Sequence, residues 1–150
     1  MQSVNRHVSL LFRMGERYLN RRLRGTGVSS GTGILLIELR DGGPRHFAGL
    51  AAAVGADKSH ITRSIRALQG AGLVSVTPGP SDRRTLVVSI TESGQLAAGQ
   101  VEAAILSWLA VVTRGVTPQD LATVDAVMND FYANAVAYFA EADLGVDVEG

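Results

Sequence analysis

The sequence predicts a mainly α-helical fold of the α+β class, in which a helix-turn-helix precedes a two-stranded β-hairpin and further helices flank both. Two observations lead to this prediction. Apolar residues recur at helical spacing over most of the chain, and residues 73–90 contain two short runs rich in β-branched residues. Glycines and prolines between these segments set their expected ends.

Composition limits the class of protein. With 150 residues, 46% of them hydrophobic, the chain can form one globular domain, or a subunit that completes its core against a second chain. It has no cysteine, which excludes disulfides, thiolate metal sites and thiol catalysis. Arg13, Glu16 and Arg17 interrupt the N-terminal segment, so it is expected to be neither a signal peptide nor a membrane span. We therefore expect a cytoplasmic protein without a membrane partner.

The net charge of zero conceals two oppositely charged halves. Residues 1–90 hold 13 basic and 5 acidic residues, a balance of +8, whereas residues 91–150 hold 1 basic and 9 acidic residues, a balance of −8. A basic half is expected in a protein that binds a polyanion, because neutralised phosphates release counterions and so favour binding. Solvated surface charges can also be divided in this way by chance. The sequence motifs are therefore needed to distinguish a surface that binds a polyanion from a chance distribution of charge.

Two helices are expected before the helix-turn-helix. The first spans about residues 4–23, and a glycine-rich connector follows at residues 25–33. Ser30 or Thr32 can cap a second, apolar helix, which is expected to end at residues 41–44, where two glycines and a proline follow an aspartate.

The helix-turn-helix itself is predicted from its stop and start signals. After a short extended segment at residues 45–47, residues 48–54 can form a small apolar helix, and the turn follows at residues 55–56. Asp57 is a good N-cap for a second helix that runs to Gln69, since its carboxylate can accept hydrogen bonds from amides of the first helical turn.

This second helix has an apolar side and a polar side. At about 100° per residue, Ile61, Ile65 and Leu68 fall within one stripe. The other side suits DNA, because an arginine can donate two hydrogen bonds to guanine, hydroxyl groups can bond to bases or phosphates, and a lysine at the helix start suits a phosphate. The candidate DNA-contacting residues of this helix are Lys58, Ser59, His60, Thr62, Arg63 and Arg66. Any surface helix has a polar side, so the hairpin that follows is needed to support this interpretation.

The predicted hairpin carries positive charge at its tip. Its strands are expected at residues 73–77 and 85–90, and the connection between them holds two arginines. An arginine in such a position can enter a narrow minor groove, while an adjacent aspartate can hold a neighbouring arginine by a charge-assisted bond. An ordinary solvated turn is the alternative. The candidate DNA-contacting residues here are Asp82, Arg83 and Arg84.

The order and spacing of these motifs resemble the MarR family of bacterial transcription regulators. The segments that carry the resemblance are Asp57-Lys58-Ser59-His60-Ile61-Thr62-Arg63, Leu68-x-x-x-Gly72-Leu73-Val74, Asp82-Arg83-Arg84 and Ile90-Thr91-Glu92-Ser93-Gly94. The chain departs from the family pattern at Phe47-Ala48, where a serine or threonine cap is frequent, and at Gln69, where an acidic residue is frequent.

The resemblance implies a winged helix-turn-helix protein that acts as an obligate homodimer on a pseudopalindromic operator in double-stranded DNA. Within a single chain of residues 1–150, it implies a DNA-binding region at residues 34–90 and a helical dimerisation region formed by residues 1–24 and 91–145. Members are often repressors that a small, frequently phenolic or anionic ligand releases from DNA.

The acidic C-terminal part predicts two further helices. Thr91 can cap the first, and Thr117 followed by Pro118 marks the start of the second. The second helix has a seam at alternating spacings of three and four residues, which needs a partner helix. That partner can belong to a second chain or to the same chain, and the resemblance favours a dimer. The seam residues are Leu121, Val124, Met128, Phe131, Ala135 and Tyr138.

A small-molecule effector is a further expectation. A pocket between the dimer helices and the winged region can combine apolar walls with a few polar groups, which suits a small aromatic anion. The candidate lining residues are Met14, Tyr18, Ser29 and Phe47, although such residues are also ordinary core residues.

Two other classes of function are alternatives to DNA binding. A winged-helix module that binds only protein would share the fold, but it would lack salt-dependent retention on duplex DNA. An enzyme is not expected, because the three histidines lie far apart in the sequence and no hydrolase, zinc-protease or nucleotide-binding motif is present. The sequence likewise predicts no cofactor and no metal site.

Overall fold

A computed structural model describes residues 2–80 and 82–143 of the chain. The chain divides into two compact units, one up to Leu109 and one from Ala110 onward. The first unit holds the helix-turn-helix and the hairpin, and each unit is described separately here.

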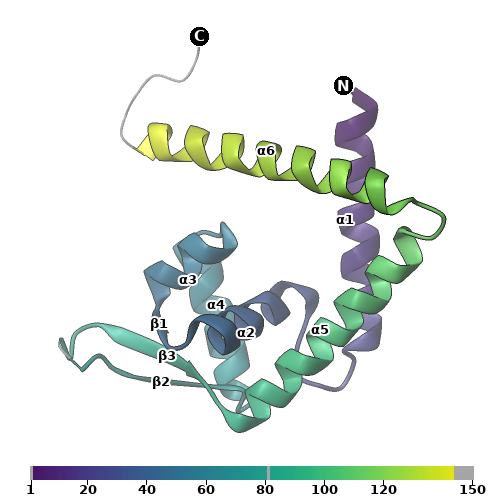
Figure 1. The fold of residues 1–150 in the computed structure, drawn as a ribbon. Helices are drawn as coiled ribbons and strands as arrows, with labels where there is room; N and C mark the ends of the chain where they lie inside the picture. The colour runs from purple at the N-terminus through teal and green to yellow at the C-terminus, as the bar shows by residue number, and fades with distance from the viewer. Residues whose placement is uncertain (1, 81, 144–150) are drawn as a thin grey trace. The chain divides into compact units, whose positions relative to one another are not determined.

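The first unit is mainly helical with one small sheet (Figure 1). Its elements, in chain order, are α1 (Gln2–Arg22), α2 (Ser30–Gly42), β1 (Arg45–His46), α3 (Phe47–Val54), α4 (Lys58–Gly70), β2 (Val74–Pro78), β3 (Leu86–Ile90) and α5 (Glu92–Val112), the last of which continues past the boundary. The predicted fold class is confirmed.

The sheet has three strands in the order β1-β3-β2, and both pairings are antiparallel. β2 and β3 form the predicted hairpin, with Val76 opposite Val88. β1 is a two-residue strand that adds to the other edge of β3, with Arg45 also opposite Val88. The extended segment predicted at residues 45–47 is therefore correct for two residues, whereas Phe47 is the first residue of α3.

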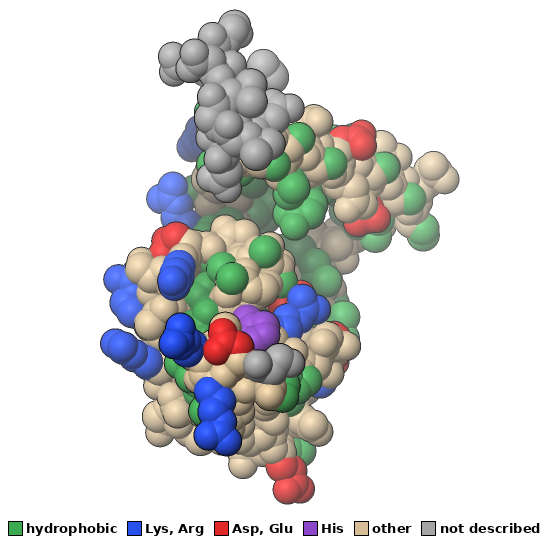
Figure 2. Space-filling model, turned by 90° about the vertical axis from the view of Figure 1, so that its left-hand side faces the viewer, with side chains coloured by type: hydrophobic (Ala, Val, Ile, Leu, Met, Phe, Trp, Pro, Cys, Tyr) green, Lys and Arg blue, Asp and Glu red, His purple; other side chains and the backbone are tan. Residues whose placement is uncertain are grey.

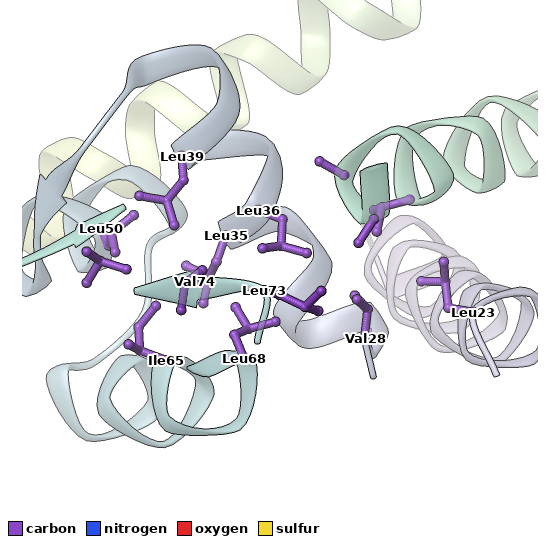
Figure 3. Close-up of a cluster of buried hydrophobic side chains, with 14 of the residues drawn as sticks. Leu23, Val28, Leu35, Leu36, Leu39, Leu50, Ile65, Leu68, Leu73 and Val74 are labelled. Carbon is purple, nitrogen blue, oxygen red and sulfur yellow. The ribbon is translucent and has the colours of Figure 1, made fainter. Parts of the chain in front are cut away.

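One hydrophobic core joins the helix-turn-helix to the sheet and to α5. Figure 3 shows the leucines of α2 facing Leu50 of α3, Ile65 and Leu68 of α4, and Val74 of β2. All three apolar residues predicted on α4 are buried, because Ile61, Ile65 and Leu68 are at most 1% exposed. Burying one such side chain contributes on the order of 2 kcal/mol, so α4 is held firmly by its apolar side.

In the first unit, three predicted helix caps are confirmed and one is wrong. Asp57 caps α4, Thr91 accepts from the Gly94 amide at the start of α5, and Gly55 ends α3 with a φ of 64°. The cap of α2 was assigned wrongly. It is Ser29, whose hydroxyl accepts from the Thr32 amide while the Thr32 hydroxyl accepts from the Ser29 amide. Thr32 is thus the third residue of a capping box.

The first turn of α5 lies against the start of β2. The Thr91 amide donates to the Leu73 carbonyl at 3.1 Å, and the Thr91 hydroxyl donates to the Gly72 carbonyl at 2.8 Å. Gly94 permits this approach, because a Cβ atom there would collide with the Leu73 carbonyl oxygen. A glycine is therefore required by close packing rather than by its φ angle.

α5 is also apolar enough, over its 21 residues, to cross a membrane on grounds of length and composition. Its small residues instead pack into the core of the first unit, where Gly94, Ala97, Ala98, Val101 and Ala104 are buried. This packing identifies α5 as a core helix of the winged-helix unit.

The second unit consists mainly of α6 (Pro118–Asp143). As predicted, Thr117 caps it: the Thr117 hydroxyl donates to Asp120 at 2.7 Å and accepts from the Asp120 amide at 3.1 Å. The predicted dimerisation region extends two residues further, and residues 144–145 lie outside the described part of the chain. The whole predicted seam is exposed, including Met128, Phe131 and Tyr138 at 44%, 50% and 49%.

Substitution of two glycines of α5 should have opposite effects on stability. Gly94→Ala must displace the Leu73 carbonyl, so we expect it to destabilise the protein by about 1–3 kcal/mol. Gly99→Ala is the matched control, since no atom lies within 4 Å of its Cβ position, and alanine favours a helix by up to about 1 kcal/mol. Urea unfolding of both variants measures the difference; equal stabilisation by both would contradict the proposed close contact.

Candidate nucleic-acid interface

The candidate interface is formed by α4, which we call the recognition helix, and by the wing, which comprises β2, β3 and the turn between them. In α4, the buried side holds Ile61, Ile65 and Leu68 together with the hydroxyl residue Ser64, which is only 6% exposed. Ser59, Arg63 and Arg66 are exposed, as the helical spacing predicts. Lys58 and His60 are exposed as well, and Thr62 is half-buried.

The start of the recognition helix is fixed by Asp57. One carboxylate oxygen, Oδ1, accepts from the His60 amide at 2.7 Å and from the Ser59 hydroxyl at 2.6 Å. The bond from Ser59 and then the bond from the His60 amide hold the pKa of Asp57 below its usual value. The carboxylate is therefore ionised at neutral pH and acts only as an acceptor.

A second hydroxyl of this helix is bonded internally. The Thr62 hydroxyl donates to the Lys58 carbonyl at 2.8 Å. A carbonyl oxygen can only accept, so the proton of Thr62 points back along the helix. The predicted contacts of Ser59 and Thr62 to phosphates need a donated proton, and both protons are engaged within the protein.

The turn of the wing is organised by Asp82 and Thr85. The Thr85 amide and hydroxyl both donate to the Asp82 carbonyl, at 3.1 and 2.7 Å, and the Gly79 amide donates to the Thr85 carbonyl at 2.7 Å. The Asp82 carboxylate accepts from the backbone amide of Arg84 at 2.9 Å. The arginine side chain predicted to pair with Asp82 has no such bond among the described residues, because the turn directs the carboxylate to the backbone. Ser81, in this turn, lies outside the described residues.

The recognition helix and the wing border a common hollow of about 520 Å³. It brings together four of the predicted residues, Lys58, Thr62, Arg66 and Arg84, over apolar groups that include Phe47 and Ile65. The predicted residues Ser59, His60, Arg63, Asp82 and Arg83 lie outside this lining. His46, Gln69 and Thr85 also line it and were not predicted; for His46, the only signal in the sequence was its place in a short extended segment.

Between residues 40 and 84, the basic residues fall into two groups. Arg40 forms ion pairs with Asp41 and Glu102 at 2.7 and 3.0 Å, and Arg45 lies 3.9 Å from Glu38. Within residues 2–80 and 82–143, no ion pair involves Lys58, Arg63, Arg66, Arg83 or Arg84. Figure 2 shows separate Lys and Arg side chains spread over the face that carries the wing, with few acidic side chains between them. These five cations are free to meet an anionic partner.

The four residues predicted to bind an effector do not share a described hollow. Phe47 lines the hollow beside the recognition helix, whereas Ser29 caps α2 and lines a different one. Tyr18 lies against Trp108 with ring centroids 5.4 Å apart, and Met14 is 56% exposed on α1. Among the described residues, no group of three His, Asp or Glu side chains is arranged to hold a metal ion.

Comparisons with known proteins agree with this geometry. Residues 33–86 match the model of the MarR family. The HTH-type transcriptional repressor NicR of Pseudomonas putida is 39% identical over 61 residues, which cover 41% of this chain and 39% of NicR. The matched segment is thus well under half of that repressor.

Solved structures resemble the chain over most of its length. A MarR transcriptional regulator from Methanosarcina mazei has a TM-score of 0.85 at 20% identity, covering 92% of this chain and 99% of its own. The structure of BpsR from Bordetella bronchiseptica, whose DNA binding is regulated by 6-hydroxynicotinic acid, has a TM-score of 0.78 at 16% identity, covering 86% and 92%. At these identities the two structures support the fold alone.

Removal of the Asp57 carboxylate should make the stability of the protein less dependent on pH. Because its pKa is lowered in the folded state, Asp57 stabilises the fold above about pH 4, and this contribution is lost as the pH falls through the lowered value. We expect Asp57→Ala to lower the melting temperature at neutral pH, and its difference from the parent to shrink as the pH falls through the lowered pKa of Asp57. Asp57→Asn, which keeps an acceptor for the His60 amide, is the control. A difference between parent and Asp57→Ala that is constant with pH would contradict this account.

Proposed function

We propose that this chain is a member of the MarR family and acts as a homodimeric transcriptional regulator that binds double-stranded DNA in a sequence-specific manner. One observation carries the proposal: five cations without an ion pair among the described residues lie on the exposed side of a recognition helix and on the wing beside it. The family consists of transcriptional regulators rather than enzymes.

The recognition helix suits the major groove. Its apolar side is buried in the core, so Arg63 and Arg66 project from a fixed helix toward a partner. Either arginine can donate two hydrogen bonds to O6 and N7 of a guanine, and Lys58 at the helix start suits a phosphate. The His60 side chain is exposed and can contact a base or the backbone.

The wing suits the adjacent backbone or minor groove. Asp82 and Thr85 fix the turn by bonds to the main chain, so Arg83 and Arg84 need not order the loop themselves. Their guanidinium groups are exposed and available for phosphates, or for the enhanced negative potential of a narrow minor groove. Asp82 is therefore proposed to position the wing rather than to contact DNA.

A homodimer would set the distance between two recognition helices. Two-fold symmetry then calls for a pseudopalindromic operator, with half-sites about one helical turn, ~34 Å, apart. We propose residues 34–90 as the DNA-binding region and residues 1–24 with 91–145 as the dimerisation region. The exposed apolar residues of α1 and α6 support this assignment, because so many apolar side chains in contact with water favour association.

We further propose that the chain is a repressor released by a small aromatic anion. NicR is named as a transcriptional repressor, which supports repression, and 6-hydroxynicotinic acid, which regulates the DNA binding of BpsR, is the model for the class of ligand proposed here. Such a ligand must bind differently to the DNA-competent and incompetent forms of the dimer. Met14, Tyr18, Ser29 and Phe47 are proposed only as separate candidates for contacts with such a ligand, because they do not share a hollow in the described chain. Because the proposed target is chromosomal DNA, we also propose a cytoplasmic location.

Replacement of both wing arginines should weaken DNA binding. For Arg83→Ala with Arg84→Ala, we expect affinity for the protein's own promoter duplex to fall about ten-fold or more, since up to two phosphate contacts are lost. The slope of log affinity against log salt should decrease by about one per lost contact. Fluorescence anisotropy at several salt concentrations measures both quantities.

The control for the wing variant is Arg114→Ala, which removes the one basic residue of the acidic half. It should leave affinity and salt slope close to those of the parent. Equal losses of DNA affinity in both variants would indicate an effect of net charge rather than of the wing. If the parent showed no salt-dependent retention on duplex DNA, a module that binds only protein would be favoured.

A charge in the seam of α6 should disrupt the dimer. Phe131 is 50% exposed in the single chain, so burying it against a second chain favours association, whereas an aspartate there would have to be desolvated. We expect Phe131→Asp to raise the dimer dissociation constant at least about ten-fold in sedimentation equilibrium. Asn129→Asp, on the other side of the helix, adds the same charge and should leave the dimer intact. A dimer equally stable in both variants would place the interface elsewhere.

A further inference from the structure

We propose that Ser59 reads bases as a hydrogen-bond acceptor, and that it selects adenine or cytosine at the position it faces in the major groove. This inference rests on the proposed function. It adds that Ser59 accepts, rather than donates, the hydrogen bond in its contact with a base. It concerns the exposed hydroxyl at the start of the recognition helix, where side chains enter the groove first.

The proton of the Ser59 hydroxyl is engaged by Asp57. The distance of 2.6 Å from Oγ to Oδ1 is that of a short, charge-assisted bond, and a carboxylate has no proton to donate. Ser59 must therefore be the donor. Its Oγ keeps two lone pairs, and these are what the exposed side chain can offer to a partner.

The major-groove edges of the four bases differ in what they can give to such an acceptor. Adenine and cytosine each present an amino group, at N6 and N4, whereas guanine and thymine present only acceptors and, for thymine, a methyl group. An oxygen without a free proton can bond to the first two bases only. The same reasoning excludes phosphate oxygens, which also need a donor.

Rotation of the hydroxyl to donate outward would break the bond to Asp57. That would remove a hydrogen bond from an ionised carboxylate, a costlier change than the loss of a bond between neutral groups. Thr62 provides the comparison within the same helix: its hydroxyl donates to the neutral Lys58 carbonyl at 2.8 Å. A carbonyl in a helix also accepts the amide four residues later, so Thr62 is freer to reverse its polarity.

The acceptor polarity of Ser59 complements its neighbours. Lys58, Arg63 and Arg66 can only donate, so they suit guanine edges and phosphates. Ser59 supplies the opposite polarity on the same exposed surface. A recognition helix that both donates and accepts can distinguish the two strands of a base pair, because the amino group lies on one strand only.

The test begins with selection of duplexes from a random pool by the full-length protein. At each adenine or cytosine of the enriched half-site, the amino group is then removed by substituting purine or pyrimidin-2-one. We expect one position at which this removal weakens binding by the parent about three- to ten-fold, the value of one hydrogen bond. Ser59→Ala should bind the duplex with this amino group and the duplex without it equally, because the variant lacks the hydroxyl oxygen that accepts the hydrogen bond.

Asp57→Asn and Thr62→Val serve as matched variants. Asp57→Asn replaces the ionised acceptor by a neutral amide, so we expect selection with this variant to admit guanine or thymine at the position assigned to Ser59. Thr62→Val should leave the preference at that position unchanged. Circular dichroism spectra show whether all variants keep the helical fold.

The outcomes separate the two proposals. If no duplex is enriched by the parent, the proposed function fails, and the inference fails with it. If a site is enriched but removal of each amino group affects the parent and Ser59→Ala equally, Ser59 is not an acceptor for a base. A selected guanine or thymine whose preference is lost in Ser59→Ala would overturn the inference as well.

Discussion

The burial of one side of α4 is the constraint on which the rest of the structure depends. Ile61, Ile65 and Leu68 are held in a core that α2, α3, β2 and α5 share, so the helix cannot rotate about its axis without exposing them. Burial of these three side chains contributes several kcal/mol by the usual value per buried group. This fixed orientation gives the polar side of the helix a defined direction. A protein that recognises base edges by hydrogen bonds requires such a direction.

Hydrogen bonds within the protein then decide what the polar side can do. Carboxylates near the surface are used locally: Asp57 caps the recognition helix, Asp82 binds a main-chain amide, and Asp41 engages Arg40. These arrangements leave the arginines of α4 and the wing without intramolecular ion pairs in the described chain. The basic charge that a polyanion would meet is therefore a consequence of where the acids are bonded, as well as of the number of basic residues.

Much of this organisation could be predicted from sequence, because local signals determine it. Asp57, Thr91 and Thr117 are predicted to cap their helices, and each prediction is confirmed. The cap of α2 was predicted wrongly because Ser29, Ser30 and Thr32 have the same local chemistry, and only the path of the chain distinguishes them. β1 has two residues, too few for periodicity to indicate a strand, and the partner of Asp82 depends on the turn geometry. The prediction of the effector residues rests on their chemistry, which does not determine whether side chains distant in sequence share one hollow.

The central claim is that two copies of this chain present two recognition helices to successive major grooves. Hydroxyl-radical footprinting of a duplex enriched by the full-length protein tests it most directly. The account predicts two protected segments on one face of the duplex, related by two-fold symmetry and centred about 10 base pairs apart. A single protected segment, or protection without a fixed spacing, would contradict it.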